Sequence, residues 1–371
     1  MKPRLLIVGP LPPPIGGVET VTQAILEAPA FETFDVHHVD ITKGRPKQTQ
    51  GRFDLGNFYW AMRHFARMRS AVARFRPDAV YMPVASSWSG FLRDGVLAKI
   101  AKASGAKVIG HVHGGRFDQI LNYNGLAARR VRRALSHFDV LLALGTRWLE
   151  LIRDSGFRGR VYVVPSTLKQ DFFDRASALS SLPRQEADAT ALFVGQVGRR
   201  KGIFDLLAAL RGAIDLGARI RLVVVGPSEY PKELEEAKRL TDALSLRDVV
   251  RFTGPLMNEC LLKEFAAADF LVMPSYAEGL PVVFFEAGAF GMPVVTTPVG
   301  AIPDLIESGR NGMLVNPGDV EGIRDALMMM AGDSEARRKM GRQLNEDIQR
   351  FHPHAVSQRI AAILEENLAV R

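Results

Sequence analysis

The chain has 371 residues, of which 47% are hydrophobic and 24% charged, with a formal net charge of +8. This length suits two α/β domains, and the composition is that of a soluble globular protein. A single cysteine, Cys260, excludes an intrachain disulfide, and we expect a core thiol in a reducing compartment. No apolar run reaches the roughly 18 residues that span a bilayer, and the apolar start at 4–9 is too short for a signal segment. We therefore expect a cytoplasmic protein.

The charge is divided unevenly along the chain. Residues 1–180 hold 26 Lys and Arg against 14 Asp and Glu, whereas the remainder holds 22 against 26. A basic N-terminal half indicates an anionic partner such as a membrane surface, a phosphorylated substrate or a nucleic acid, although a solvated basic face accounts for it equally well. The sequence contains neither an aromatic-rich single-strand motif nor a helix-turn-helix pattern, so we expect no nucleic-acid partner.

Short apolar segments alternate with helical stretches along the whole chain, which predicts βαβ units and parallel sheets. The expected strands are 5–9, 34–39, 79–82, 108–112, 140–144, 161–164, 191–194, 220–225, 249–252, 270–273, 294–296 and 313–315. A polar, weakly periodic stretch at 177–188 is the expected linker. We therefore predict one domain over 1–176 and another over 189–352. The apolar residues of the last segment, 353–371, predict a further helix with Val356, Ile360, Ile363 and Leu364 on one face.

The first strand-to-helix turn contains two adjacent glycines, Gly16 and Gly17. Glycines at a helix start allow the backbone to approach a phosphate closely, although a plain tight turn is the alternative. The turn is not Gly-x-Gly-x-x-Gly, which argues against dinucleotide binding.

The fourth strand runs into His111-Val112-His113-Gly114-Gly115. Residues two apart on a strand share a face, so we expect both imidazoles to point the same way. His113, at the carboxyl end of the strand, is the better site candidate. A metal would need at least a third ligand, and none is apparent nearby in the sequence, so we expect no metal.

The first strand of the second half leads into a glycine-broken turn with three consecutive cations, Arg199, Arg200 and Lys201. This pattern suits a diphosphate. Cations at a helix start oppose the helix dipole, so a purely structural role is disfavoured, although a solvated charged turn stays open. Later strand ends at 225–227 and 251–256, with Gly254 and Leu256, fit a base or a ribose.

The segment 275–286 places two carboxylates, Glu278 and Glu286, eight positions apart. Glu278 follows a strand at the edge where open parallel sheets bind ligands. A helix starting near Pro281 would aim unpaired backbone N–H groups at an anion. Glu286 falls in an apolar second turn, where an acid needs a partner. The segment therefore predicts a polar ligand that carries a phosphate, framed by turns at 297–304 and 309–312.

Taken together, these motifs resemble the family 4 retaining glycosyltransferases. The likeness covers nearly the whole chain and is strongest over 268–319, where Pro-Ser, Glu-Gly, Pro, Glu-Ala, Gly-x-Pro-Val-Val and Asn-Gly occur in order. The resemblance implies the GT-B fold, in which two Rossmann-like, doubly wound domains face each other across a cleft and the C-terminal helix crosses back to the N-terminal domain. The N-terminal domain would then bind the acceptor and the C-terminal domain the nucleotide sugar.

The resemblance also implies roles for individual residues. Glu278 would contact the donor sugar near the reacting carbon, Glu286 would hold the ribose, Lys201 would neutralise the diphosphate, and His113 would lie beside the sugar and the acceptor. Further residues expected to bind the donor are Gly16, Gly17, Arg199, Arg200, Gly254, Leu256, Gly279, Leu280, Pro281 and Val282. The donor would be a UDP- or GDP-linked sugar, and the reaction is expected to be metal-independent and to need no cofactor.

One position departs from the family pattern. The family has an arginine five residues before Lys201, and this chain has Gln196 there. A neutral amide lacks both the charge and the guanidinium fork. Our hypothesis is that Arg199 or Arg200 compensates.

The expected activity is retaining hexosyl transfer from a nucleotide sugar to a hydroxyl of a glycan or lipid-linked acceptor, in cell-surface polysaccharide or glycolipid synthesis. A sugar-nucleotide epimerase with the GT-B fold is the alternative. For retention, Glu278 acts as a nucleophile, or the acceptor attacks on the leaving-group face.

The segment 57–75 and a cluster at 129–133 combine arginines with apolar residues, as in helices that bind the anionic inner face of a membrane. A core helix with a charged outer face is the other interpretation.

Overall fold

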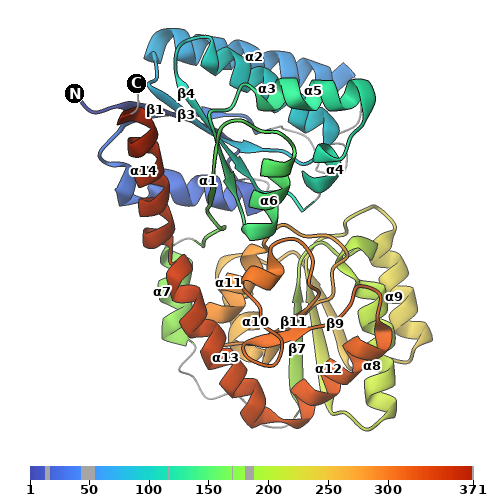
Figure 1. The fold of residues 1–371 in the computed structure, drawn as a ribbon. Coiled ribbons are helices and arrows are strands. Elements are labelled where there is room, and N and C mark those ends of the chain that lie inside the picture. Colours follow the sequence, from blue (N-terminus) through green and yellow to red (C-terminus); the bar gives the residue numbers. More distant parts are fainter. Residues whose placement is uncertain (13–16, 43–54, 116, 169, 180–187, 370–371) are drawn as a thin grey trace. The chain divides into compact units, whose positions relative to one another are not determined.

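The computed structural model describes residues 1–12, 17–42, 55–115, 117–168, 170–179 and 188–369. The chain divides into two units, Met1–Gln170 with Phe351–Arg371, and Asp171–Arg350. Figure 1 shows both, each with a central sheet between helices. The division falls at 170/171 rather than at 176, at the start of helix α7 (Gln170–Leu179). In the second unit, Phe172 of α7 makes edge-on ring contacts with Phe265 and Phe290, at 6.0 and 6.2 Å between centroids.

The first unit is built on a six-stranded parallel sheet with the order β2-β1-β3-β4-β5-β6. Its strands are β1 (Arg4–Gly9), β2 (Asp35–Asp40), β3 (Ala79–Val84), β4 (Lys107–Val112), β5 (Val140–Ala143) and β6 (Arg160–Val163). Its helices are α1 (Gly17–Glu27), α2 (Leu55–Phe75), α3 (Trp88–Lys102), α4 (Phe117–Leu121), α5 (Gly125–Leu135), α6 (Thr146–Asp154) and α14 (Pro353–Ala369). The central strands are continuous apolar runs because helices cover both faces of the sheet. In Figure 1, α2, α3 and α5 lie side by side over one face.

The C-terminal helix α14 packs against the first unit, as predicted for a helix that returns to the N-terminal domain. Its apolar face is buried, and the residues that form it include Val356, Ile360, Ile363 and Leu364. On its polar side, Glu366 forms an ion pair with Arg160 at 2.8 Å. The chain therefore leaves the first unit once and comes back to complete it.

The second unit has a six-stranded parallel sheet with the order β12-β11-β10-β7-β8-β9. Its strands are β7 (Ala189–Val194), β8 (Ile220–Val225), β9 (Val250–Gly254), β10 (Phe270–Met273), β11 (Val294–Thr296) and β12 (Gly312–Leu314). Besides α7, its helices are α8 (Ile203–Asp215), α9 (Glu233–Ala243), α10 (Asn258–Ala267), α11 (Val282–Ala289), α12 (Val320–Gly332) and α13 (Ser334–Ile348). Chain order along the sheet reverses between β7 and β10. Such a switch point is where open α/β sheets bind ligands.

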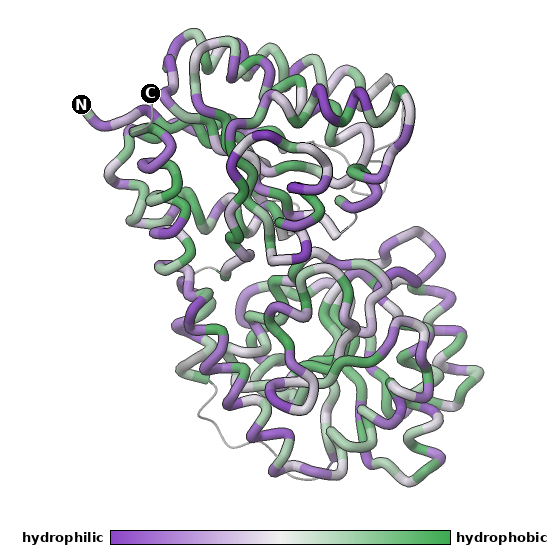
Figure 2. Tube along the Cα trace, viewed as in Figure 1, coloured by the Kyte–Doolittle hydropathy of each residue, from purple (hydrophilic) through white to green (hydrophobic). Residues whose placement is uncertain are grey.

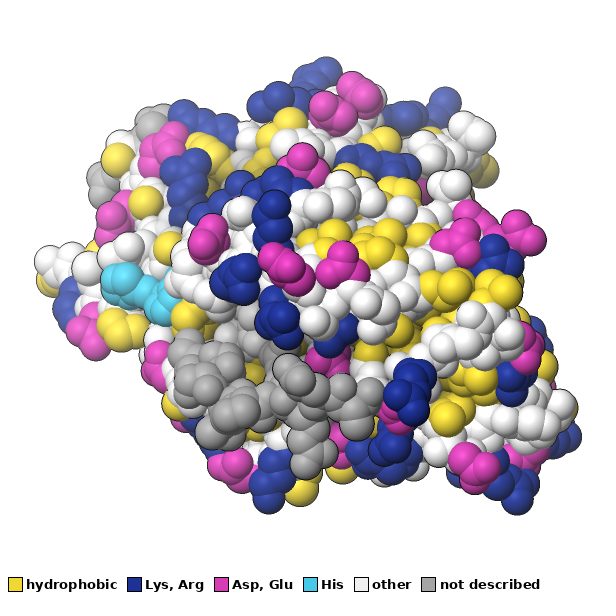
Figure 3. Space-filling model, turned by 90° about the horizontal axis from the view of Figure 1, so that it is seen from below, with side chains coloured by type: hydrophobic (Ala, Val, Ile, Leu, Met, Phe, Trp, Pro, Cys, Tyr) yellow, Lys and Arg dark blue, Asp and Glu magenta, His cyan; other side chains and the backbone are white. Residues whose placement is uncertain are grey.

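Hydrophobic segments mark the core of each unit. In Figure 2 the strands are green, and purple gathers on the outward sides of the helices. The face drawn in Figure 3 carries Lys and Arg interspersed with Asp and Glu around hydrophobic side chains, so neither sign of charge dominates it.

In the described part of the chain, no helix is both long and apolar enough to cross a membrane. The prediction of a core thiol is wrong, because Cys260 is exposed near the start of α10.

Candidate active site

Two oppositely charged side chains meet at the switch point of the second sheet. Lys201 follows β7 and Glu278 follows β10, and these strands are hydrogen-bonded neighbours. Lys201 Nζ lies 2.5 Å from Glu278 Oε1, and only 12% and 10% of the two side chains are exposed. An ion pair this well buried draws its strength from a local dielectric far below that of water. The sheet order thus brings together two charges that lie far apart in the sequence.

Arg200 contacts both Glu278 and Gln196. Its guanidinium donates to the Ala277 carbonyl at 3.1 Å and approaches Glu278 Oε1 at 3.6 Å. Both of these contacts are made by Nη1, whereas Nη2 donates to Gln196 Oε1 at 3.4 Å and Nε pairs with Glu229 Oε1 at 2.5 Å. Arg200 therefore places a guanidinium beside the neutral residue that stands at the family's arginine position.

Arg199 is directed elsewhere. Its guanidinium pairs with Glu236 at 2.9 Å and lies over the Phe204 ring at 4.5 Å, and 69% of the side chain is exposed. Of the two arginines proposed to compensate for Gln196, the geometry favours Arg200.

Two glycines hold the surrounding loops in close approach. Gly202 has φ +72°, and a Cβ there would lie 2.1 Å from the Pro274 carbonyl oxygen. Gly300 has φ +62°, and a Cβ there would lie 2.1 Å from the Glu278 carbonyl oxygen. Only glycine fits such positions without strain. The turn after Lys201 is thereby pressed against the end of β10, and the loop after β11 against Glu278.

The start of α11 offers unpaired backbone donors to the same edge of the sheet. Pro281 precedes the helix, as predicted, and Phe284 N–H bonds to its carbonyl oxygen at 3.1 Å. Within the described residues, the N–H groups of Val282 and Val283 have no backbone or side-chain acceptor. Leu280 and Gly279 are buried immediately before this turn. Free N–H groups at a helix start, together with the helix dipole, favour an anion.

Glu286 is an acid with unused acceptor capacity. It lies on α11 among buried Phe284, Phe285 and Ala287, and burial raises its pKa to about 7. Across the part of the chain that the structure describes, its carboxyl group makes no hydrogen bond or ion pair. A half-buried acceptor of this kind is stabilised by a ligand that brings hydroxyl donors.

His111 and His113 share one face at the carboxyl end of β4, as predicted, with ring centroids 4.0 Å apart. His111 Nε2 bonds to the Val164 carbonyl oxygen at 3.0 Å, which requires a proton on Nε2. Its Nδ1 therefore accepts from the Tyr81 hydroxyl at 2.6 Å. Burial lowers the His111 pKa to about 4, and burial next to His111 lowers the His113 pKa well below its usual value. Both rings are neutral near pH 7.

The remaining predicted positions are Gly16, Gly17, Gly254 and Leu256. Gly16 is outside the described residues, whereas Gly17 opens α1. Gly254 ends β9 and accepts from Gly226 N at 2.9 Å, and Leu256 follows it half-buried. In the described ranges, no group of three or more His, Cys, Asp and Glu could hold a metal ion.

Sequence reasoning missed Glu229, which anchors Arg200. It lies four residues past the end of β8, at the same edge of the sheet as Lys201 and Glu278. The strand-end rule would have found it had the search continued past Pro227. Tyr81 was also missed, because a tyrosine inside a buried strand carries no signal of its hydrogen-bond partner.

Comparison with known proteins gives two family matches. The family described as "Glycosyl transferases group 1" matches residues 174–347, and the "Glycosyl transferase 4-like domain" matches residues 16–167. The chain is 35% identical over 204 residues to a D-inositol 3-phosphate glycosyltransferase from Streptomyces avermitilis, which is 52% of this chain and 44% of the relative. The chain spans less than half of the length of the curated relatives it matches.

Solved structures match over nearly the whole chain. A sucrose-phosphate synthase from Thermosynechococcus elongatus has a TM-score of 0.78 at 19% identity, with all of both chains covered. An Anabaena protein in complex with UDP-glucose has a TM-score of 0.72 at 17% identity, covering 98% of this chain and 99% of the other. At these identities the likeness establishes a shared two-domain α/β architecture.

Proposed function

Because the chain belongs to the group 1 glycosyltransferases of family 4, with the GT-B fold, we propose that it moves a hexosyl group from a nucleotide sugar to a hydroxyl of a glycan or lipid-linked acceptor, with retention. The observation that carries this proposal is the buried Lys201–Glu278 pair beside the free N–H groups of α11. Glycosyl transfer passes through an oxocarbenium-like state while the leaving diphosphate gains negative charge. Cations and N–H dipoles at the switch point are suited to stabilise that charge.

The donor is a UDP- or GDP-linked sugar, and a structural neighbour in complex with UDP-glucose makes UDP the first to test. Lys201, with Arg200 and the α11 N–H groups, binds the diphosphate, and the roles of Gly16 and Gly17 stay predictions from the family resemblance. The carboxyl group of Glu286 accepts hydrogen bonds from the ribose hydroxyls, which supply the donors that it lacks within the described residues. Glu278 contacts the sugar. No metal or cofactor takes part.

The contacts of Glu278 favour one account of retention. A carboxylate whose Oε1 lies 2.5 Å from an ammonium group and 3.6 Å from a guanidinium is a weakened nucleophile. We therefore favour attack of the acceptor on the leaving-group face. The bond from C1 to the acceptor oxygen forms as the bond to the diphosphate breaks, and the diphosphate takes the hydroxyl proton. His113, neutral at the end of β4, helps to orient the acceptor.

Incubation with a panel of nucleotide sugars tests this function. Slow release of free sugar, with the α configuration kept in the first product, supports the retaining transferase. A changed sugar that stays attached to its nucleotide supports the epimerase. If the protein carries out neither reaction with any UDP- or GDP-linked sugar, both the transferase and the epimerase functions are contradicted.

We further propose that the protein is cytoplasmic and binds the inner face of the membrane through α2, in polysaccharide or glycolipid synthesis. His64, Met68 and Val72 are buried on one side of α2. Phe58 and Met62, 66% and 49% exposed, lie on the same helix. A core helix accounts for the buried side only, and exposed apolar residues next to arginines suit an anionic interface.

Co-sedimentation with vesicles tests this membrane proposal. Vesicles of phosphatidylcholine with phosphatidylglycerol should bind the wild-type protein. Binding should weaken when Arg63 and Arg67 are changed to glutamine, and again when Phe58 and Met62 are changed to serine. Vesicle binding that none of these changes reduces contradicts the proposal.

A further inference from the structure

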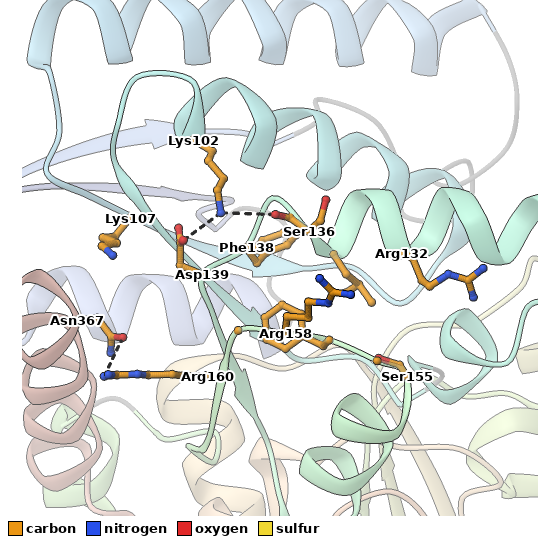
Figure 4. A pocket seen from close by; sticks show the side chains of 14 residues that line it. Lys102, Lys107, Arg132, Ser136, Phe138, Asp139, Ser155, Arg158, Arg160 and Asn367 are labelled. Atoms are coloured by element: carbon orange, nitrogen blue, oxygen red, sulfur yellow. Dashed lines mark hydrogen bonds and ion pairs between the residues drawn. The ribbon is translucent and has the colours of Figure 1, made fainter. Parts of the chain in front are cut away.

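A basic cavity of about 670 Å³ lies in the first unit, at the amino ends of β4, β5 and β6 (Figure 4). His113 lies past the opposite, carboxyl end of β4, so this cavity is separate from the predicted acceptor side. The charged side chains that line it are Lys102, Lys107, Arg132, Asp139, Arg158 and Arg160. Five cations therefore surround a space that one carboxylate shares.

The single carboxylate cannot neutralise this set. Asp139 already accepts from Lys102 Nζ at 3.0 Å and from the Val108 N–H at 2.9 Å. Arg160 is paired with Glu366 of α14. Among the residues that the structure describes, Lys107, Arg132 and Arg158 form no ion pair. Three of the five lining cations are thus left without a counter-charge.

The pKa of a histidine next to the cavity also indicates a positive electrostatic potential there. His137 lies on the loop between α5 and β5, next to the lining residues Ser136 and Phe138. Its pKa is lowered by burial and by the positive charges of Lys99, Lys102 and Arg133. Each of these cations disfavours a further positive charge and, by the same field, favours a negative one.

The loop that carries Arg158 is held against the sheet. A Cβ on Gly159 would lie 2.4 Å from both the Asp139 carbonyl oxygen and the Phe157 ring. Arg160 N–H then donates to the same Asp139 carbonyl at 3.0 Å. The loop can take this path only with glycine at 159, and Figure 4 shows Arg158 brought over the cavity as a result. The cation is therefore positioned by packing rather than by a salt bridge.

We propose that this cavity binds a phosphate-type dianion, a phosphate monoester or a diphosphate, through Lys107 and Arg158 with Lys102 and Arg160 at its sides. The volume suits a small molecule or a headgroup. A guanidinium fork beside ammonium groups matches phosphate oxygens in geometry and charge. The ligand comes either from a soluble phosphate ester or from a lipid headgroup.

Calorimetric titration of the full chain with inorganic pyrophosphate tests the site. The proposed donor site also attracts a diphosphate, so each variant is measured in the Lys201→Gln background as well. We expect saturable binding that survives Lys201→Gln and weakens at least about tenfold in Lys107→Gln/Arg158→Gln. The control Arg338→Gln/Arg342→Gln removes two exposed charges from α13 and should leave binding unchanged. Equal weakening by both double variants, or no binding in the Lys201→Gln background, overturns the proposal.

Two further arms identify the source of the phosphate. If vesicles with phosphatidic acid bind the protein through this cavity, Lys107→Gln/Arg158→Gln reduces co-sedimentation and pyrophosphate competes with the vesicles. If the ligand is soluble, the same variant loses pyrophosphate binding while vesicle binding is unchanged. Either pattern supports the site. Failure of Lys201→Gln to change donor binding would contradict the proposed function and leave this cavity's test intact.

Discussion

Lys201 and Glu278 form a buried ion pair across the point where strand order reverses, with 2.5 Å between Nζ and Oε1. A pair in this position does two things. It neutralises two charges in the free protein, and under the proposed function it holds a cation where the diphosphate would bind. The first two predictions concern this pair and the arginine beside it.

We expect the pair to be energetically coupled. Lys201→Met leaves a largely buried carboxylate with only the more distant guanidinium of Arg200, and should lower the free energy of unfolding by about 2–4 kcal/mol. Adding Glu278→Gln removes the stranded charge, so the double variant should be less destabilised than the sum of the single changes by about 1–3 kcal/mol. Urea denaturation measures all four proteins. The exposed pair Glu235 and Lys238 serves as control, with an expected coupling below about 0.5 kcal/mol. Additive effects at Lys201 and Glu278 would contradict the pairing.

The two arginines before Lys201 should differ in their effect on donor binding. Arg200→Gln removes the guanidinium beside Gln196 and Glu278, and should weaken UDP binding at least about tenfold. Arg199→Gln removes a side chain that faces Glu236 and solvent, and should change the affinity by less than about twofold. Calorimetry on both variants decides the matter. Weaker binding from Arg199→Gln alone would assign the compensating role to Arg199.

Glu286 should make stability depend on pH. Its pKa in the fold, about 7, is above its ordinary value of 4.5. The protonated acid is thus the form that the fold favours, so its contribution is complete below pH 4.5 and is lost as pH rises through 7. Glu286→Gln, which stays neutral, should therefore gain stability over the wild type between pH 5 and pH 8, by about 1–3 kcal/mol. Thermal unfolding across this pH range measures the gain, and a constant difference contradicts it.

The same residue should make donor affinity depend on pH in the opposite direction. Ribose hydroxyls donate to the ionised carboxylate, so UDP should bind the wild type more tightly at pH 8 than at pH 6. Glu286→Gln should bind weakly with little pH dependence, because it has no ionisable group at that position. A pH dependence that persists unchanged in the variant assigns the titration to another group.

His113 should affect turnover more than donor binding. Its ring is neutral near pH 7, so it can orient an acceptor hydroxyl by hydrogen bonding. His113→Ala should lower kcat with the acceptor by about ten- to a hundredfold while UDP affinity stays within twofold. His137→Ala, a histidine of the first unit away from the carboxyl end of β4, is the control and should keep normal turnover. Equal losses of kcat and UDP affinity in His113→Ala would place the residue on the donor instead.

The twelve strands found in the described residues could be predicted from the sequence, to within about two residues at most ends. Parallel strands buried on both faces are uninterrupted apolar runs, such as Phe270–Met273, and glycine or proline marks where they end. The C-terminal helix could also be predicted, because apolar residues recur there at helical spacing. These residues, Val356, Ile360, Ile363 and Leu364, are all buried. Cys260 was misjudged because an average cysteine is buried, and nothing around it showed that it lies on the outer side of α10.

The contacts of the candidate site were less accessible to sequence reasoning. The sequence showed that Lys201 and Glu278 each follow a strand. Their contact, however, depends on β10 pairing with β7, and this pairing is set by the order of strands in the sheet. The choice between Arg199 and Arg200 depends on which acid each reaches, Glu236 or Glu229, and both acids come from later segments. Side-chain direction of this kind follows from packing and is not encoded in the spacing of the motif.

The central claim is that the edge of the second sheet beside β7 and β10 binds the diphosphate of a nucleotide sugar. Calorimetric titration of UDP and GDP into the wild-type protein and into Lys201→Gln tests it most directly, with Lys238→Gln as a charge-matched control on exposed α9. The account predicts saturable binding of one of the two nucleotides, weakened at least about tenfold by Lys201→Gln and unchanged by Lys238→Gln. Equal affinity in the wild type and in Lys201→Gln would contradict it.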